Sequence, residues 1–161
     1  MILYFLRHGK AEPHHGDDAG RHLTDAGADA LRRAAVLWRR LNLRPQVILT
    51  SPLARARETA ELFREGIGSR HDPVIDPRLA PGAGWDQLAQ AMAAHPDARR
   101  VLFVGHQPDL GSAIELLTGA ISVRLRPGSL ACIEFPGVPE AGTGEIAWLL
   151  DPDLYASGED G

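Results

Sequence analysis

Short apolar runs alternate along this chain with segments whose apolar residues recur at helical spacing. Residues 2–6, 46–50 and 100–105 are apolar runs of strand length bounded by polar or glycine-containing segments, and they predict buried strands. Residues 74–75 predict at most a short strand. Two later runs, 129–135 and 145–150, are separated by a proline- and glycine-rich segment, which predicts a hairpin.

Helical periodicity fills the intervals between these strands. Thr24 is a predicted N-cap, and the helix after it has a single apolar face formed by Leu31, Ala34, Ala35, Leu37, Trp38 and Leu41. A second helix is expected from Ser51 as N-cap with Pro52 in its first position. Two more helices are predicted at 85–95 and 108–119, the latter with Gly119 as its C-cap.

The order of strands and helices predicts an α/β fold. We expect a three-layer sandwich, with a mostly parallel central sheet covered by helices on both faces and an antiparallel pair at one side. Residues 1–161 are predicted to form one domain, with a flexible tail from about 153 to 161. In such sheets, ligands bind beyond the carboxyl ends of the strands.

Composition and charge narrow the classes of protein to which the chain can belong. The net charge of −4 disfavours a nucleic-acid-binding surface, and Cys132, the single cysteine, excludes an intramolecular disulfide. No apolar stretch has the length of a membrane span, and the N-terminal residues do not form a signal peptide. We therefore expect a cytoplasmic protein that does not bind a membrane; the sequence does not predict its oligomeric state.

Polar residues follow three of the predicted parallel strands. Arg7 and His8 end the first strand, Ser51 ends the second, and His106 ends the third, while Arg55 lies one turn into the helix after Ser51. A phosphoryl group needs fixed positive charge, which the guanidinium fork supplies. A neutral imidazole can attack phosphorus and carry the phosphoryl group. The nearby arginines are expected to lower the pKa of His8 and so keep it neutral.

Three motifs in this order resemble the histidine phosphatase superfamily, also called phosphoglycerate-mutase-like. They are LRHGKAE (6–12), TSPLARARETA (50–60) and VGHQPDL (104–110), and the resemblance covers nearly the whole chain. The small size, the short LAPGAGWDQL segment (79–88) and the segment DDAGRHLTDAG (17–27) are most similar to the SixA branch of phosphohistidine phosphatases. The resemblance implies the phosphoglycerate-mutase-like fold.

The resemblance also implies roles for individual residues. It implies that His8 is the phosphorylated nucleophile, that Arg7 and Arg55 bind the phosphate, and that His106 stabilises the charge on the phosphoryl oxygens. The remaining residues that we assign to phosphate or substrate binding are Gly9, where a missing Cβ leaves room for phosphate, and Arg21, Ser51 and Gln107. Arg57 is two residues beyond Arg55 and is expected to point elsewhere.

The sequence departs from the larger members of the superfamily because no residue clearly matches their general acid. Asp86 is in about the right region, and Glu12 and Asp17 follow the nucleophile. A phosphoramidate N–P bond is labile when its nitrogen is protonated. Its cleavage therefore depends less on a general acid of the enzyme than the cleavage of a phosphate ester does. The absence of a matching acid favours phosphohistidine on a protein as the substrate.

Other functions remain open at this stage. A small-molecule phosphomonoester phosphatase has the same chemistry, whereas a mutase needs a longer capping insertion than the chain has between Phe63 and Trp85. A phosphoprotein-binding module with little turnover is the alternative from another class. We predict no cofactor and no metal, although His14, His15, Asp17, Asp18 and His22 share one loop and suit zinc or nickel chemically.

Overall fold

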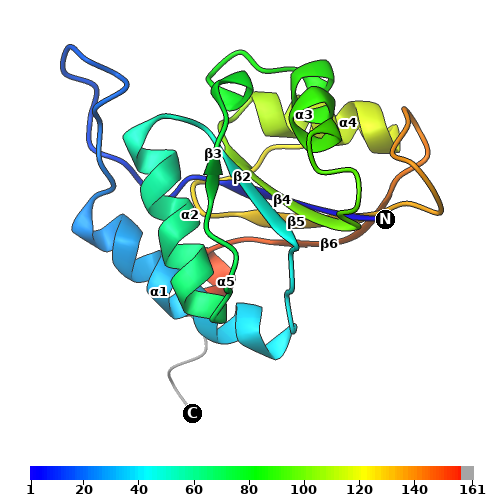
Figure 1. The fold of residues 1–161 in the computed structure, drawn as a ribbon. Helices are drawn as coiled ribbons and strands as arrows, with labels where there is room; N and C mark the ends of the chain where they lie inside the picture. Colours follow the sequence, from blue (N-terminus) through cyan, green and yellow to red (C-terminus); the bar gives the residue numbers. More distant parts are fainter. Residues whose placement is uncertain (157–161) are drawn as a thin grey trace.

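The computed structural model describes residues 1–156 and consists of strands and helices that alternate along most of the chain (Figure 1). In chain order the elements are β1 (Ile2–Arg7), α1 (Asp25–Arg40), β2 (Val47–Thr50), α2 (Ala54–Ile67), β3 (Val74–Ile75), the 3-10 turn η1 (Pro77–Leu79), α3 (Trp85–Ala93), β4 (Arg100–Gly105), α4 (Asp109–Thr118), β5 (Leu130–Glu134), β6 (Glu145–Leu150) and α5 (Asp153–Ala156). This is the predicted α/β order.

The strands form one six-stranded sheet in the order β3-β2-β4-β1-β5-β6. The pairs β1–β4, β2–β4 and β2–β3 are parallel, whereas β1–β5 and β5–β6 are antiparallel. The predicted mostly parallel sheet with an antiparallel pair at one side is therefore confirmed. Because β1, β2 and β4 run in the same direction, their carboxyl ends meet at one edge of the sheet.

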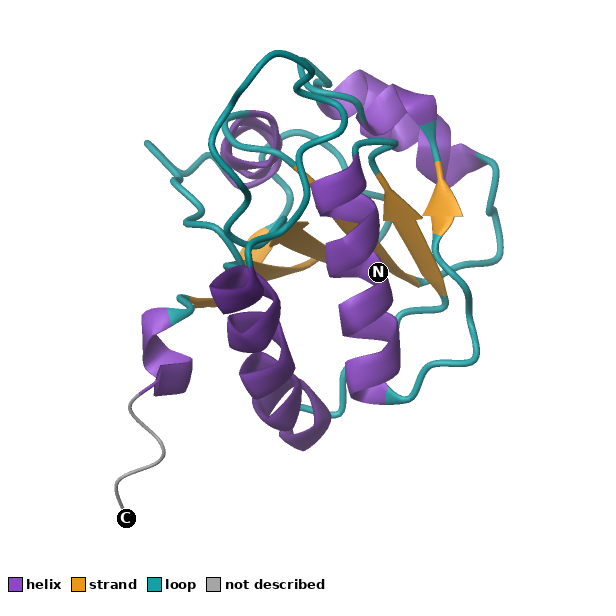
Figure 2. Cartoon of the chain, turned by 90° about the vertical axis from the view of Figure 1, so that its left-hand side faces the viewer, coloured by secondary structure: helices purple, strands orange, loops and turns teal. Residues whose placement is uncertain are grey.

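Helices cover both faces of the sheet, which gives the three layers (Figure 2). Within β1, Leu3 and Phe5 face the apolar cluster that includes α3 and α4, and Leu6 faces the cluster that includes α1 and α2. On the second face, Trp38 of α1 packs against Phe63 of α2 with 4.9 Å between ring centroids. Full burial on both faces explains why β1 reads as an uninterrupted apolar run.

Two predicted helix boundaries differ in the structure. Helix α2 begins at Ala54 with Leu53 as N-cap, because the hydroxyl of Ser51 accepts from the Leu53 N–H and is hydrogen-bonded to His106. Helix α3 ends at Ala93 instead of residue 95, where the last turn tightens and the N–H of His95 donates to Met92 O. The predicted caps Thr24 and Gly119 are confirmed.

The predicted flexible tail overlaps a folded element. Residues 153–156 form the short helix α5, and the Asp153 carboxylate is bound by the Arg126 guanidinium, which anchors the start of this helix. The remaining part of that prediction, 157–161, lies outside the described residues.

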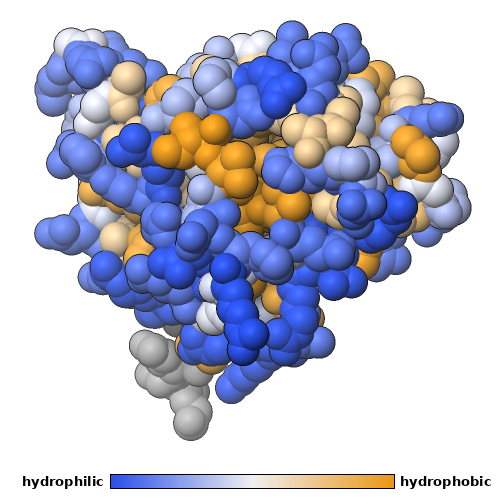
Figure 3. All heavy atoms as spheres, viewed as in Figure 1, coloured by the Kyte–Doolittle hydropathy of each residue, from blue (hydrophilic) through white to orange (hydrophobic). Residues whose placement is uncertain are grey.

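The open edge of the sheet at β3 exposes apolar side chains. Val74 is 41% exposed and Ile75 is 52% exposed, and hydrophobic surface is visible around β3 in the space-filling view (Figure 3). None of the helices within residues 1–156 has the length and apolar character required to cross a membrane.

Candidate active site

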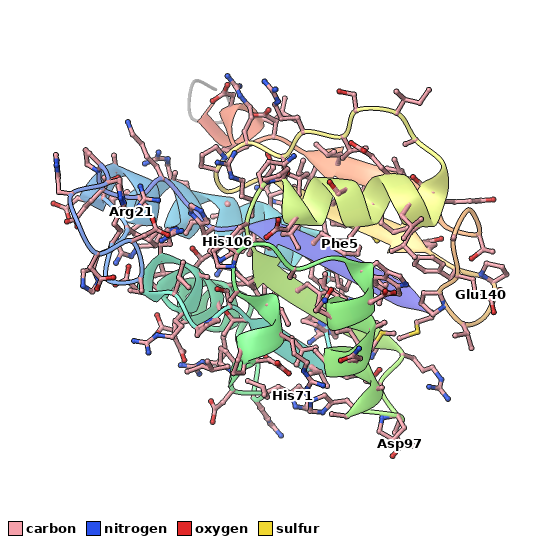
Figure 4. All side chains as sticks on the ribbon, turned by 90° about the horizontal axis from the view of Figure 1, so that it is seen from above. Phe5, Arg21, His71, Asp97, His106 and Glu140 are labelled. Atoms are coloured by element: carbon pink, nitrogen blue, oxygen red, sulfur yellow. The ribbon has the colours of Figure 1, made fainter. Side chains whose placement is uncertain are left out.

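The carboxyl edge of the sheet brings together the polar residues that the sequence places at strand ends. Arg7 ends β1 and is followed by His8, Ser51 follows β2, and His106 follows β4. Arg55 lies in the first turn of α2 and is 4% exposed. Seen from above, His106 lies on the side of the molecule that carries the loop with Arg21 (Figure 4). The predicted neighbours are therefore assembled at one edge.

His8 is held with one ring nitrogen free of a proton. Its Nδ1 lies 2.7 Å from the carbonyl oxygen of Gly9, and a carbonyl can only accept, so Nδ1 carries the hydrogen. Nε2 is then the unprotonated nitrogen, and it accepts at 3.3 Å from Nε of Arg55. This arrangement gives Nε2 a lone pair next to a fixed positive charge, as attack on phosphorus requires.

The electrostatics of the site keep His8 neutral. The pKa of His8 is lowered to about 4, mainly by burial and also by the positive charges of Arg55, Arg7 and Arg21, against the opposing hydrogen bond to Gly9. We predicted the direction of this pKa shift from the arginines. The structure makes desolvation of the 8%-exposed imidazole its largest cause.

Arg55 is oriented by the loop after β1. Its Nη1 donates to the backbone oxygen of Asp18 at 2.8 Å, and its Nη2 donates to the Asp18 carboxylate at 3.1 Å. Nε of Arg21 lies 2.9 Å from the other oxygen of the same carboxylate. Asp18 thus fixes two guanidinium groups, and its pKa is held below the ordinary value mainly by its hydrogen bond and ion pair with Arg55, which outweigh desolvation.

Asp18 is a site residue that we named only as a metal-ligand candidate. The signal for its position was present, because Asp18 and Arg21 are three residues apart in the loop that follows β1 and His8. What the sequence did not contain is the approach of this loop to the first turn of α2, which depends on tertiary packing.

His106 is the second histidine of the site and lies next to His8. The two rings lie 5.3 Å apart between centroids, and Nε2 of His106 shares a 2.7 Å hydrogen bond with the Ser51 hydroxyl. Burial lowers the pKa of His106 to about 3, helped by His8 and Arg55. Ser51 therefore orients a histidine in this structure, and its hydroxyl is already engaged.

Arg7 is anchored at one end only. Its Nη1 donates to Leu125 O at 2.8 Å, and burial lowers its pKa. Among the described residues, neither Nε of Arg7 nor Nδ1 of His106 has a hydrogen-bond partner, although both atoms are buried. Since buried polar atoms are normally satisfied, these two atoms are suited to the oxygens of a phosphoryl group.

Gly9 has a different reason for being glycine than the one we predicted. A Cβ at this position would lie 2.9 Å from Leu31 Cδ1 and 3.2 Å from Leu23 Cδ2, so packing against apolar side chains fills that space. The Gly9 N–H donates to Thr59 Oγ1 at 3.0 Å, and the Thr59 hydroxyl donates to Arg55 O. Gly9 therefore ties the segment after β1, which carries His8, to α2.

Gln107 and Arg21 are placed at the border of the site. The Gln107 amide donates to Val123 O and accepts from the Leu125 N–H, so this side chain holds the loop whose Leu125 carbonyl anchors Arg7. Arg21 donates to Glu12 O and pairs with Asp18. In this structure Gln107 therefore contacts the loop that anchors Arg7, and Arg21 contacts the Asp18 carboxylate that also binds Arg55.

Within residues 1–156, the candidate acids make no side-chain hydrogen bond or ion pair with His8. Asp86 and Glu12 are exposed, and none of the side-chain hydrogen bonds or ion pairs found within residues 1–156 joins either carboxylate to His8, Arg55 or His106. Asp17 accepts from the Ala19 N–H in its own loop. Asp18 is the carboxylate held at the site.

The histidines of the loop after β1 are dispersed over its surface. His14 lies 3.5 Å from Asp18, and His22 pairs with Glu58, which raises the pKa of His22 above its ordinary value. Within the part of the chain that the structure describes, no group of three or more His, Cys, Asp or Glu side chains is arranged to hold a metal ion. The loop serves the site through Asp18.

Comparisons with known proteins agree with this geometry. The model of the histidine phosphatase superfamily (branch 1) matches residues 3–81. An uncharacterized protein from Picosynechococcus sp. (strain ATCC 27264 / PCC 7002 / PR-6) is 42% identical over 122 residues, which are 73% of this chain and 73% of that protein.

Solved structures share the fold over nearly the whole chain. The protein histidine phosphatase SixA complexed with tungstate is similar with a TM-score of 0.84 and 24% identity, covering 96% of this chain and 99% of that one. The alpha-ribazole phosphatase from Shigella flexneri is similar with a TM-score of 0.74 and 17% identity, covering 94% and 97%. At these identities the likeness shows the fold alone.

Proposed function

The chain belongs to the histidine phosphatase superfamily, and we propose that it hydrolyses phosphohistidine on a protein through a covalent intermediate at His8. The match to the histidine phosphatase family model, together with the phosphatases whose structures this chain resembles, supports a hydrolase that acts on phosphate esters. The residues that carry the reaction and the class of substrate are the proposal.

The observation that carries the proposal is the paired state of the two nitrogens of His8. Nδ1 donates to Gly9 O, and Nε2 accepts from Nε of Arg55, so the nucleophile is neutral, oriented and next to a guanidinium. In the first step the lone pair of Nε2 attacks phosphorus, and the bond from phosphorus to the leaving nitrogen breaks. Arg7, Arg55 and His106 stabilise the charge that develops on the phosphoryl oxygens.

The second step regenerates the enzyme. A water attacks phosphorus, the P–Nε2 bond breaks with its electron pair returning to Nε2, and the proton of the water passes to the released phosphate or to solvent. The low pKa of His8, about 4, means that the freed nitrogen stays unprotonated and ready for another turnover.

The environment of the carboxylates supports phosphohistidine as the substrate class. Asp18, the carboxylate that contacts Arg55, has a lowered pKa and two arginine partners, which makes it a poor proton donor. A phosphohistidine leaves as an imidazole that takes its proton from solvent beforehand, whereas an alkyl alkoxide needs an acid in the transition state. The fold shared with SixA, described as a protein histidine phosphatase, supports the same class.

A small-molecule phosphomonoester is the second candidate substrate. The fold is shared with the alpha-ribazole phosphatase from Shigella flexneri, and all the phosphate-facing groups of the site serve an ester equally well. Asp86, at the start of α3, is the carboxyl group that such a reaction would recruit. The two classes differ in whether an acid is needed.

Two further statements belong to this proposal. We assign the activity to the cytoplasm, where the single buried thiol of Cys132 fits a reducing compartment. We also treat 1–161 as one domain, since β1 and β5, which are far apart in the sequence, pair directly in the sheet.

The test compares a phosphohistidine peptide with an aryl phosphate and an unactivated sugar phosphate, for the wild type and His8→Ala, with EDTA present. We expect turnover of the peptide and of the aryl phosphate, loss of both in the variant, and little turnover of the sugar phosphate. A fast reaction with the sugar phosphate contradicts the substrate class. Binding of the phosphopeptide without turnover indicates the phosphoprotein-binding module instead.

A further inference from the structure

A second pocket lies at the opposite edge of the sheet from His8. It encloses about 450 Å³ and is formed where β2 and β4 begin and α2 ends. Three separate segments contribute its polar lining: Arg44 and Gln46 from the loop before β2, Ser69, Arg70 and His71 from the loop after α2, and Arg100 from the start of β4. This volume lies in the range of small-molecule sites.

The pocket concentrates positive charge in a protein whose net charge is −4. Arg44, Arg70 and Arg100 line it and no Asp or Glu does. Among residues 1–156, no carboxylate lies within ion-pair distance of these three guanidinium groups, whereas Arg64 beside them pairs with Glu61 and Asp72. Three unneutralised guanidinium groups around one hollow repel each other and are stabilised by a multivalent anion.

The backbone that carries these cations is fixed. Nε of Arg100 donates to Arg44 O at 2.7 Å, and Oε1 of Gln46 accepts from the N–H of Arg100 at 3.1 Å. On the other wall, the Ser69 N–H donates to Arg64 O and the Ser69 hydroxyl oxygen accepts from the His71 N–H. The loops are therefore held in place while the guanidinium termini remain available to a ligand.

The negative end of the α2 dipole does not cancel this charge. The last carbonyls of α2 accept from the N–H groups of Gly68 and Ser69, and Gly66 O accepts from Nη1 of Arg39. The surface at this end of the molecule is predominantly hydrophilic in the space-filling view (Figure 3).

We propose that the pocket formed by Arg44, Arg70 and Arg100 binds a small anion that carries two or more phosphate groups. A single exposed guanidinium–anion pair contributes little in water, so a ligand with one charge would not be retained. A chain of phosphates presents oxygens in the paired geometry that each guanidinium matches, and it bridges the three segments at once. This site is separate from the catalytic phosphate site and does not depend on the proposed reaction.

The test follows tripolyphosphate binding to ¹⁵N-labelled protein by amide chemical shifts at low salt. The catalytic site also attracts phosphate, so the two sites are separated by position: the amides of residues 43, 44, 46, 69–71 and 100 report the pocket, and those of residues 7–9 report the active site. The test variant is the double variant Arg44→Gln with Arg70→Gln. The matched control is Arg32→Gln with Arg33→Gln, which removes the same charge from the exposed surface of α1.

We expect saturable shifts at the pocket in the wild type, with affinity at least ~tenfold lower in the test variant and unchanged in the control. The shifts at residues 7–9 and the turnover of an aryl phosphate stay as in the wild type for both. Shifts at the pocket that do not saturate, or that weaken equally in the control, overturn the site as a diffuse effect of charge. If the wild type does not turn over the aryl phosphate, the proposed function is contradicted, but the binding result at the pocket still stands.

Discussion

The two edges of the sheet carry the same residue types, histidine and arginine, which are mostly buried at one edge and mostly exposed at the other. At the carboxyl edge, His8, Arg55 and His106 are buried and joined by hydrogen bonds to each other or to their neighbours. At the amino edge, Arg70 and His71 are exposed, and the charge in the pocket has no counterion among the described residues.

This difference teaches that burial, more than residue type, sets the protonation state of a histidine. Desolvation moves the pKa of His8 to about 4 and that of His106 to about 3, and hydrogen bonds then decide which nitrogen carries the proton. The arginines that line the pocket at the amino edge have no carboxylate partner among the described residues, so their guanidinium groups are available to an anionic ligand. The four predictions below test this contrast.

The largest effect is expected from replacing the buried histidine. His8→Ala removes the attacking nitrogen and should lower kcat/KM for an aryl phosphate on the order of 10³-fold or more. The matched exposed variant His71→Ala should stay within about twofold, as expected of a surface substitution. Steady-state kinetics measure both. Trapping a phosphorylated His71, or near-wild-type turnover by His8→Ala, would refute the assignment.

The same contrast applies to the arginines. Arg55→Lys keeps the charge but loses the Nε contact to His8 and the two contacts to Asp18, so kcat/KM should fall by about 10²-fold. Arg70→Lys should leave turnover unchanged. Thermal melting of both variants controls for folding. Equal kinetics in the two variants would mean that orientation by Asp18 does not matter.

A third effect concerns stability at acid pH. His8 and His106 have folded-state pKa values below the ordinary 6.5, so the unfolded chain binds more protons from that value down to about 4 for His8 and about 3 for His106. Their contribution to stability is therefore fully present above pH 6.5 and is lost as the pH falls, by up to about 1.4 kcal/mol per pH unit for each histidine.

Urea midpoints across this pH range measure the loss. His8→Gln should show a shallower fall than the wild type, and His71→Gln should show the wild-type slope. If His8→Gln and the wild type have the same slope, the imidazole of His8 is not held neutral by burial.

The smallest effect is expected at the exposed carboxylate. Asp86→Asn should change turnover of a phosphohistidine peptide by less than about twofold, because Asp86 is exposed and makes no hydrogen bond or ion pair with His8, and a surface substitution has little effect. The same variant assayed on a sugar phosphate provides the comparison. A large loss of rate on the peptide would show that Asp86 donates a proton and belongs to the active site at the carboxyl edge of the sheet.

The sequence alone determined the element order and which polar residues gather at the carboxyl edge of the sheet. Apolar runs of strand length fixed β1, β2 and β4, because strands buried on both faces need apolar residues at every position. Parallel strands share an edge, so the polar residues at their carboxyl ends, His8 and His106 among them, were predictable as neighbours.

Only the tertiary structure decided how those neighbours interact. Asp18 contacts Arg55, which is 37 residues away in the sequence. The space beside Gly9 is filled by Leu31 and Leu23, which come from later segments of the chain. Likewise, the arginines of the amino edge come from three segments whose convergence no local pattern records. Local sequence specifies periodicity and turns, whereas contacts between distant segments depend on how the layers pack, and burial, which sets the pKa of His8, exists only once they have packed.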